Sequence, residues 1–501
     1  MNNTQMISGA ANLVPIYAEV FLLIAASAIL LIDMFLDQSK RAITYALTLA
    51  ALVGAAFFSF ADYSSGSTVY AFSNMFVNDP MGNLLKLFSY LTMGMTLVYA
   101  RQYSTDRGML GGNLGGEFYV LALFSMLGQM VMISANNFLT IYLGLELMSL
   151  SLYALVALRR DDAKATEAAM KYFILGALAS GFLLYGMSML YGATGTLEIG
   201  EIAKKIGSGT VDRSILTFGL VFVVAGLAFK LGAVPFHMWV PDVYQGAPTG
   251  VTLLLGGAPK LATFAICVRL LVEGMLPLAF DWQNMLMILA VLSLAVGNLT
   301  AIAQTNLKRM LAYSTIAQMG FVLLGLLAGV VDQKPTHAAA AYSAAMYYSI
   351  TYVLTTVGTF GLIMVLARQG FEAEEIDDFK GLSKRSPLYA ALMSVLLFSL
   401  AGVPPMMGFA AKFAVLQSVL TTGAVWLTVF AVMFSLVGAF YYIRIVKVMW
   451  FDEPTDTAPL AVNTDKGIVL ALNGLAVVAL GMMPDSLLHA CYTAIEKTLA
   501  S

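Results

Sequence analysis

Long, continuous apolar runs dominate this chain, and short polar segments separate them. The runs are rich in Leu, Ala, Met and Gly and show no two-residue alternation. A bilayer interior admits only helices or closed barrels, and barrel strands are short alternating segments. The pattern therefore predicts an all-α polytopic membrane protein with about 14 transmembrane helices. We expect them near 13–36, 42–62, 82–101, 117–135, 138–158, 166–191, 214–240, 249–272, 283–304, 310–331, 341–368, 388–420, 425–450 and 466–489.

Composition supports this interpretation. Of the 501 residues, 59% are hydrophobic and 11% are charged, whereas a soluble domain carries about 25% charged residues. The net charge of −2 provides no basic surface for nucleic acid. Cys267 and Cys491 are far apart and lie outside any Cys/His cluster, so the sequence predicts no metal site.

The basic residues predict the orientation of the helices. Sixteen Lys and Arg residues fall in the gaps after odd-numbered spans, and six fall on the opposite side. Cytoplasmic loops carry the excess of basic residues. Both chain termini are therefore expected outside the cytoplasm, on the periplasmic side of a bacterial inner membrane.

Five lysines lie in the predicted spans and belong to neither the loops nor the span ends, and one carboxylate lies similarly deep in the fifth span. A charge at the bilayer centre costs at least about 2.5–3.5 kcal/mol, so these groups should face one another or water inside the bundle. Lys86 and Lys171 lie close enough to span ends that their side chains could instead extend to the membrane surface. The six residues are Lys86, Glu146, Lys171, Lys230, Lys260 and Lys412.

Two spans contain prolines where a helix should continue. The seventh reads Lys230-Leu-Gly-Ala-Val-Pro-Phe-His237, and the twelfth reads Ala401-Gly-Val-Pro-Pro-Met-Met-Gly-Phe-Ala-Ala-Lys412. Proline removes a backbone donor and glycine permits unwinding, so both spans should be broken helices. Paired broken helices are typical of transport sites. Lys230 precedes its break, where the helix dipole favours a cation. Lys412 follows its break, where the dipole disfavours one.

The two breaks belong to a weak internal repeat. An offset of 169 residues places Val234-Pro235 over Val403-Pro404, and an offset of 176 places Lys171-Tyr over Tyr347-Tyr. Five spans per unit is an odd number, so two such units must be inverted relative to each other. The expected organisation is an N-terminal three-helix segment (1–110), two inverted repeats (116–275 and 283–450) and a C-terminal helix (466–489).

These residues suggest proton transfer. Burial disfavours the charged form of lysine, and a nearby carboxylate such as Glu146 favours it, so a buried Lys–Glu pair can take up and release protons. His237 could pass protons or only stabilise the unwound turn. Likewise, the polar residues of the tenth span could line water or form interhelical hydrogen bonds. They are Tyr313, Ser314, Thr315 and Gln318.

Four segments resemble the antiporter-like membrane subunits of respiratory complex I, the proton-translocating NADH–quinone oxidoreductase. They are Gly144-Leu-Glu-Leu-Met-Ser-Leu, Lys171-Tyr-Phe-Ile-Leu-Gly-Ala-Leu-Ala-Ser-Gly, Phe229-Lys-Leu-Gly-Ala-Val-Pro-Phe-His-Met-Trp-Val-Pro-Asp and Asn306-Leu-Lys-Arg-Met-Leu-Ala-Tyr-Ser. The chain is most similar to the N-type branch. Lys412 supports this, because the M-type branch and many antiporters have glutamate there.

The resemblance implies a role for each candidate residue. Glu146 would adjust the charge of Lys230, Lys260 would link the two units, and Lys412 would serve the second unit. Lys171 and Lys308 match positions of weaker effect. Flavin, iron–sulfur clusters and quinone would lie in or near other subunits, with no redox cofactor in this chain. The expected partners are other complex I membrane subunits, especially the M-type subunit and small neighbours.

Two alternatives to a proton-translocating complex I subunit remain. A subunit of a multi-subunit Na⁺/H⁺ antiporter shares most of the buried charges and would move protons in a sodium-dependent way without NADH. A non-pumping structural subunit would use its lysines only to hold half-helices together.

Overall fold

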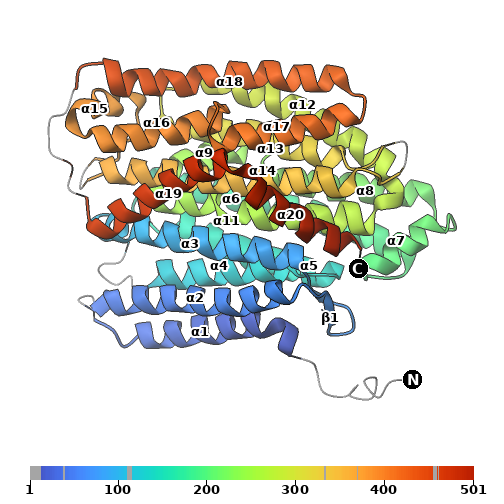
Figure 1. The fold of residues 1–501 in the computed structure, drawn as a ribbon. Helices are drawn as coiled ribbons and strands as arrows, with labels where there is room; N and C mark the ends of the chain where they lie inside the picture. Colours follow the sequence, from blue (N-terminus) through green and yellow to red (C-terminus); the bar gives the residue numbers. More distant parts are fainter. Residues whose placement is uncertain are drawn as a thin grey trace.

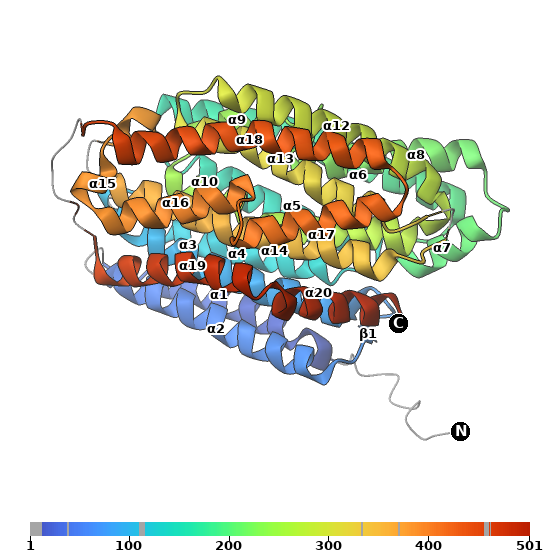
Figure 2. The same ribbon diagram turned by 45° about the horizontal axis from the view of Figure 1, so that its top comes forward.

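The computed structural model describes residues 13–37, 40–109, 116–331, 334–368, 371–454, 460 and 462–500. Residues 1–12 and 501 lie outside the described residues, and with them the predicted positions of the two chain ends. In the described part, the chain folds into a bundle of helices (Figure 1). In the view of Figure 1, α1 and α2 form the lower edge of this bundle and α18 forms the upper edge, and the turned view shows α12 beside α18 (Figure 2).

The first part of the chain forms three long helices and a small hairpin. Its elements are η1 (Val14–Ile16), α1 (Tyr17–Asp33), α2 (Arg41–Ser65), β1 (Val69–Ala71), β2 (Phe76–Asn78) and α3 (Pro80–Asp106). The hairpin pairs Val69 with Asn78 and Ala71 with Phe76 in antiparallel register. The hairpin lies between the second and third predicted spans, so it leaves the all-α class of the spans unchanged. Two strands form here because this segment lies between spans, so the bilayer's requirement for helix does not apply.

The middle of the chain contains the first broken helices. Its elements are α4 (Glu117–Ile133), α5 (Phe138–Val156), α6 (Ala163–Thr194), α7 (Ile199–Gly207), α8 (Arg213–Leu231), α9 (Trp239–Gly246), α10 (Thr249–Gly256), α11 (Ala258–Cys267) and the π-helix η3 (Val268–Gly274). α8 and α9 form the seventh span, and α10, α11 and η3 form the eighth.

The rest of the chain contains the second group of spans. Its elements are η4 (Leu276–Leu278), α12 (Ala279–Ile302), α13 (Leu307–Leu327), α14 (Ala338–Leu366), η5 (Ile376–Phe379), α15 (Leu382–Arg385), α16 (Pro387–Ala401), α17 (Met407–Thr421), α18 (Val425–Phe451), α19 (Thr464–Met482) and α20 (Pro484–Leu499). α16 and α17 lie end to end, as do α19 and α20 (Figures 1 and 2).

Among the described residues, eleven helices are long and apolar enough to cross a membrane by length and composition. Every predicted span corresponds to a helix or to consecutive helices, which confirms the fold class. The fourteenth span differs in detail: Pro484 begins a second helix, so the span continues to Leu499 instead of ending near residue 489. The eighth, tenth and eleventh spans are almost wholly buried and form the centre of the bundle.

Close backbone contacts recur at a fixed distance along the chain. A Cβ atom on Gly128 of α4 would lie 2.4 Å from the Met148 amide nitrogen of α5. A Cβ atom on Gly297 of α12 would lie 2.7 Å from the equivalent nitrogen of Ala317 in α13. Both residues of the second pair are 169 positions further on, which is the offset that the sequence suggested.

α7, the hairpin and the last described residues lie at one end of the bundle, and α15 lies at the other (Figures 1 and 2). We call these the α7 end and the α15 end. The helix breaks lie between these two ends of the bundle, so the side chains beside the breaks lie in its middle.

Candidate functional site

The seventh span breaks at Gly232. This glycine has a φ of +82°, a conformation that glycine adopts at little cost and that ends helices. Its N–H donates to the carbonyl oxygens of Ala228 (2.9 Å) and Phe229 (3.0 Å). The second half-helix, α9, starts at Trp239, whose indole N–H donates to the Phe229 oxygen at 2.9 Å. The predicted break is therefore confirmed.

Lys230 lies one residue before the end of α8, and its side chain points to α5. It is 9% exposed, and its Nζ donates to Ser149 Oγ at 2.8 Å. Glu146 lies one helical turn before Ser149 on α5. These two described side chains form no ion pair within 4.0 Å, and Glu146 Oε1 is buried without a hydrogen-bond partner. The structure thus brings Glu146 and Lys230 to one region, while the influence of one on the other stays a prediction.

Lys260 lies beside a third break that the sequence analysis missed. α10 ends at Gly256 and α11 starts at Ala258, with Gly257 between them. Lys260 is 2% exposed. Its Nζ donates to the carbonyl oxygens of Lys230 (3.2 Å) and Leu231 (2.8 Å) at the C-terminus of α8. The eighth span therefore supplies the cation that binds the broken end of the seventh.

The twelfth span breaks at Gly402, which has a φ of +83°. Lys412, 8% exposed, donates to the carbonyl oxygens of Leu400 (3.1 Å) and Ala401 (2.9 Å) and to Ser435 Oγ of α18 (2.8 Å). The expected dipole effect at Lys412 is wrong. Although Lys412 follows the break, its side chain reaches back to the C-terminus of α16, where the helix dipole favours a cation.

For Lys171 and Lys86 the sequence left two alternatives open, a buried charge or a side chain that extends to the membrane surface. Lys171 is not a deep charge: its side chain is 42% exposed and forms ion pairs with Glu167 (2.8 Å) and Asp242 (2.7 Å). Lys86 does not extend to the membrane surface, because it forms a buried ion pair with Glu19 at 2.5 Å. The Lys171–Asp242 and Lys86–Glu19 pairs form through helix packing that hydropathy does not show, whereas Glu167 precedes Lys171 by one turn of α6.

Lys308 and His237 complete the set of predicted residues. Lys308 is fully buried, and it donates to the Ala247 carbonyl at the end of α9 (2.7 Å) and to Glu374 (3.0 Å). His237 lies half-buried in the segment between α8 and α9, and its Nδ1 has no hydrogen-bond partner. In the described structure, no hydrogen bond or ion pair joins His237 to the lysines. The structure therefore groups Lys230, Lys260 and Glu146 at one break and Lys412 at the other.

The polar stretch of the tenth span forms interhelical hydrogen bonds. Thr315 Oγ1 lies 2.7 Å from the Tyr352 hydroxyl, and Ser314 bonds to Tyr442. The Gln318 amide donates to the Leu400 carbonyl at 3.0 Å, the same oxygen that Lys412 binds. This network therefore reaches the Lys412 site.

Sequence reasoning missed a buried ionic cluster on the eighth span. Arg269 is one of the six basic residues assigned to the gaps on the periplasmic side, yet it is buried and forms ion pairs with Asp79 (2.6 Å) and Glu273 (2.7 Å). Glu19, the partner of Lys86, was also missed. Glu19 lies inside the first predicted span and could have been identified there, whereas Asp79 and Glu273 lie outside the predicted spans and only the fold brings them to Arg269. Within the described ranges, no group of three or more His, Cys, Asp or Glu residues could hold a metal ion.

Comparisons with known proteins agree with the resemblance. Residues 135–438 match the transmembrane family described as NADH:quinone oxidoreductase/Mrp antiporter. The chain is 66% identical to NADH-quinone oxidoreductase subunit N of Herminiimonas arsenicoxydans, with 98% of this chain and 99% of that protein covered. It is 58% identical to subunit N of Polaromonas naphthalenivorans, with 97% and 98% covered.

Solved structures show the same architecture. A chain of respiratory complex I from Thermus thermophilus superposes with a TM-score of 0.80 at 30% identity, covering 95% of this chain and 100% of that one. A chain of the Mrp complex from Dietzia sp. superposes with a TM-score of 0.82 at 20% identity, covering 96% of each chain. At that identity the second match shows the fold alone.

Proposed function

The chain belongs to the subunit N family of NADH-quinone oxidoreductases, and from this premise we propose that it moves protons across the bacterial inner membrane. Glu146, Lys230, Lys260 and Lys412 are the proposed carriers. Quinone reduction in other subunits would supply the energy, and flavin, iron–sulfur clusters and quinone would lie in those subunits. The neighbours of this chain would include the M-type subunit and small membrane subunits.

One observation supports this proposal above the others. Three lysines, Lys230, Lys260 and Lys412, are buried beside helix breaks and bind hydroxyl or carbonyl oxygens. None of the three forms an ion pair within 4.0 Å in the described part of the chain. A buried ammonium without a close anion can be neutralised by losing its proton. A structural ion pair such as Lys86–Glu19 lacks this freedom.

The recurring contacts support the proposed division into units. We propose that 116–275 and 283–450 are inverted repeats, flanked by the three-helix segment 1–110 and the C-terminal segment that starts at 466. Asn137 and Asn306 each begin a helix and form equivalent single bridges, to Glu198 and Glu375 respectively. Both chain termini would then face the periplasm, as the basic residues predict.

The test is a pair of variants in the assembled complex. Lys230→Ala and Glu146→Ala are each reconstituted, and NADH-driven proton uptake is measured beside NADH oxidation and assembly. We expect proton uptake to fall by about tenfold or more in the Lys230 variant. Lys204→Ala is the matched control, because Lys204 lies exposed on α7. Full uptake in both variants of an assembled complex would refute the relay.

Two other functions predict different outcomes. A structural role is favoured by the positions of Lys260 and Lys412, which bind the C-terminal carbonyls of α8 and α16. It predicts that the Lys230→Ala complex assembles and pumps normally. A Na⁺/H⁺ antiporter, whose fold is similar, predicts sodium-dependent proton movement without NADH.

A further inference from the structure

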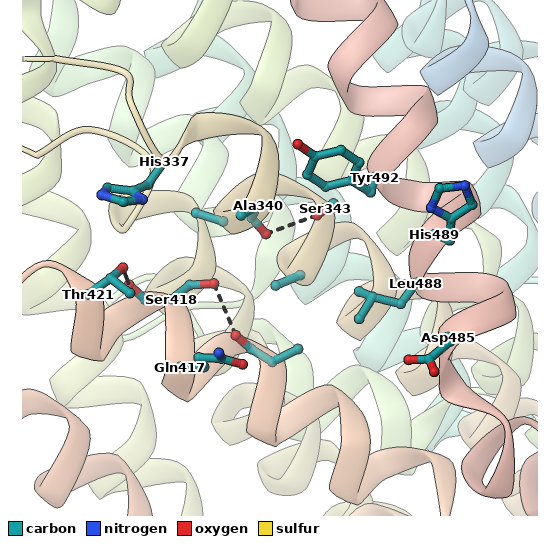
Figure 3. A pocket seen from close by; sticks show the side chains of 13 residues that line it. His337, Ala340, Ser343, Gln417, Ser418, Thr421, Asp485, Leu488, His489 and Tyr492 are labelled. Carbon is teal, nitrogen blue, oxygen red and sulfur yellow. Dashed lines mark hydrogen bonds between the residues drawn. The ribbon is translucent and has the colours of Figure 1, made fainter.

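A groove of about 540 Å³ lies between α14, α17 and α20. Figure 3 shows two histidines, an aspartate and a tyrosine around it, together with hydroxyl groups of α17. α17 and α20 lie in the half of the bundle that is nearer to the α7 end (Figures 1 and 2). The titratable groups that face the groove are His337, Asp485, His489 and Tyr492, and α17 contributes only neutral side chains such as Gln417 and Ser418.

Asp485 lies at the depth of the twelfth-span break. A Cβ atom on Gly481, at the end of α19, would lie 2.3 Å from the Pro405 carbonyl oxygen in that break. α20 starts three residues later, and Asp485 is its second residue. Asp485 is exposed and forms no ion pair with the described residues. A carboxylate that faces lipid at this depth is costly, so the groove beside it should hold water.

His489 follows Asp485 by one helical turn. Residues four apart lie on one face of a helix, and both side chains line the groove. His337 lies further along the groove, immediately before the first residue of α14. An acid and two imidazoles thus mark a path from the depth of the break towards the α7 end.

Two buried hydroxyl groups connect this groove to Lys412. Thr351 lines a cavity of about 10 Å³ that also borders Lys412, and this volume is close to the minimum that one water needs. Tyr347 lies on the same face of α14, one turn before Thr351 and one turn after Ala344, which lines the groove. Both hydroxyls are buried without a hydrogen-bond partner.

We propose that this groove is the proton release path of the second unit and that Asp485 and His489 are its carriers. The inference rests on the proposed function. The Lys412 ammonium would give one proton through the Thr351 and Tyr347 hydroxyls and become a neutral amine. The Asp485 carboxylate would take up that proton as a carboxylic acid and pass it to the neutral imidazole of His489, which gives it to water.

The first experiment tests whether the groove holds water. Ser418→Cys places a thiol in the groove, and Leu420→Cys places one on the exposed apolar side of the same helix. The native Cys267 and Cys491 are buried, so they contribute little background. A charged, membrane-impermeant thiol reagent is added to either face of the intact complex. We expect Ser418→Cys to react about tenfold faster or more, and only from the periplasmic face.

This labelling needs no turnover, so its outcome is independent of whether the chain pumps. Equal rates for the two thiols would overturn the proposal. So would a Ser418→Cys that reacts only after detergent has separated the subunits, because the groove would then be covered by a partner.

The second experiment tests the carriers. In the assembled complex, Asp485→Asn should lower NADH-driven proton uptake severalfold, and Asp485→Glu should retain it. His489→Gln should change the pH profile of uptake more than its maximum. Ser486→Ala is the matched control, because Ser486 is exposed on the same helix and its hydroxyl donates only to the Met483 carbonyl. Unchanged uptake in Asp485→Asn would refute the assignment, even if Lys230→Ala abolishes pumping.

Discussion

The breaks in the seventh and twelfth spans share one backbone geometry. The N–H groups of Gly232 and Gly402 each donate to two carbonyls of the preceding helix. In each break an ammonium binds the last two free carbonyls, those of residues 230 and 231 and those of residues 400 and 401. The two break glycines are 170 residues apart, and the prolines that follow them, Pro235 and Pro404, are 169 residues apart.

The surroundings of the two breaks differ in three ways. The cation at the first break comes from the next span, Lys260, whereas Lys412 belongs to the broken span itself. At the offset of 170, Lys230 of the first region corresponds to Leu400 of the second, so the second region has no lysine at that place. Glu146 corresponds, at the offset of 169, to Thr315, so the carboxylate of the first region is replaced by a hydroxyl group.

This difference separates two kinds of lysine. Lys260 and Lys412 satisfy carbonyls that any broken helix leaves free, so helix capping is sufficient to explain their positions. Lys230 and Glu146 have no such explanation, because neither binds a free helix end. The first region therefore contains a half-buried acid and a buried base whose positions helix capping does not explain, and the second contains one lysine within a hydroxyl and amide network.

The largest expected effect distinguishes capping from proton exchange at Lys412. Arginine keeps the charge and the donors, but it cannot be deprotonated in proteins. Lys412→Arg should therefore preserve assembly and lower NADH-driven proton uptake by about tenfold or more. Native gels and uptake measurements in reconstituted complex check this. Normal proton uptake in the arginine variant would show that Lys412 serves only to cap the end of α16.

The next effect concerns the acid that only the first region has. Glu146→Gln removes the charge at nearly constant volume and should lower uptake by about fivefold or more, within the range for loss of a proton-transfer group. Thr315→Val, at the corresponding position, should change uptake by less than about twofold, since it removes only two neutral hydrogen bonds, to the Leu311 carbonyl and the Tyr352 hydroxyl. Equal losses in both variants would remove the contrast between the regions.

The glycines at the breaks should affect stability more than activity. Gly232→Ala and Gly402→Ala each place a side chain at a positive φ, which costs about 1–2 kcal/mol. A Cβ at position 402 would also lie 2.8 Å from Lys412 Cδ, and one at position 232 would meet Val240. Both variants should lower the thermal stability of the complex, and Gly402→Ala should slow uptake more. Control substitutions at Gly181 and Gly192, where a Cβ meets nothing within 4 Å, should do neither.

The smallest effect is expected at Lys171, which corresponds to Tyr347 at the offset of 176. Its ion pairs with Glu167 and Asp242 are partly exposed, and such pairs contribute about 0–1 kcal/mol. Lys171→Met should leave assembly intact and change uptake by less than about twofold. A loss comparable to that of Lys230→Ala would place Lys171 among the carriers after all.

Hydropathy was sufficient to predict the spans, because the bilayer requires long apolar helices. The breaks at Pro235 and Pro404 were also predictable, since proline and glycine act locally. The break at Gly257 was not. Pro259 there lies in the first turn of a new helix, where proline is tolerated, so the local sequence gives no sign of an interruption.

The partners of the charged groups could not be predicted in the same way. Lys260 and Lys412 bind backbone carbonyls, which every residue has, so no side-chain pattern identifies them. Lys171 meets Asp242 and Lys86 meets Glu19, residues 71 and 67 positions away. Only the packing of helices decides which of these groups meet. Burial was correctly predicted for Lys230, Lys260 and Lys412, whereas Glu146 is half-buried, and the chemistry around each had to come from the structure.

The three acceptors of Lys412 match the three N–H donors of an ammonium group one for one. A neutral amine has one N–H fewer. If Lys412 gives up a proton, the oxygen of Leu400, Ala401 or Ser435 must therefore lose the hydrogen bond that it accepts from Nζ. A change of charge at this nitrogen would thereby weaken the attachment of α17 either to the end of α16 or to α18.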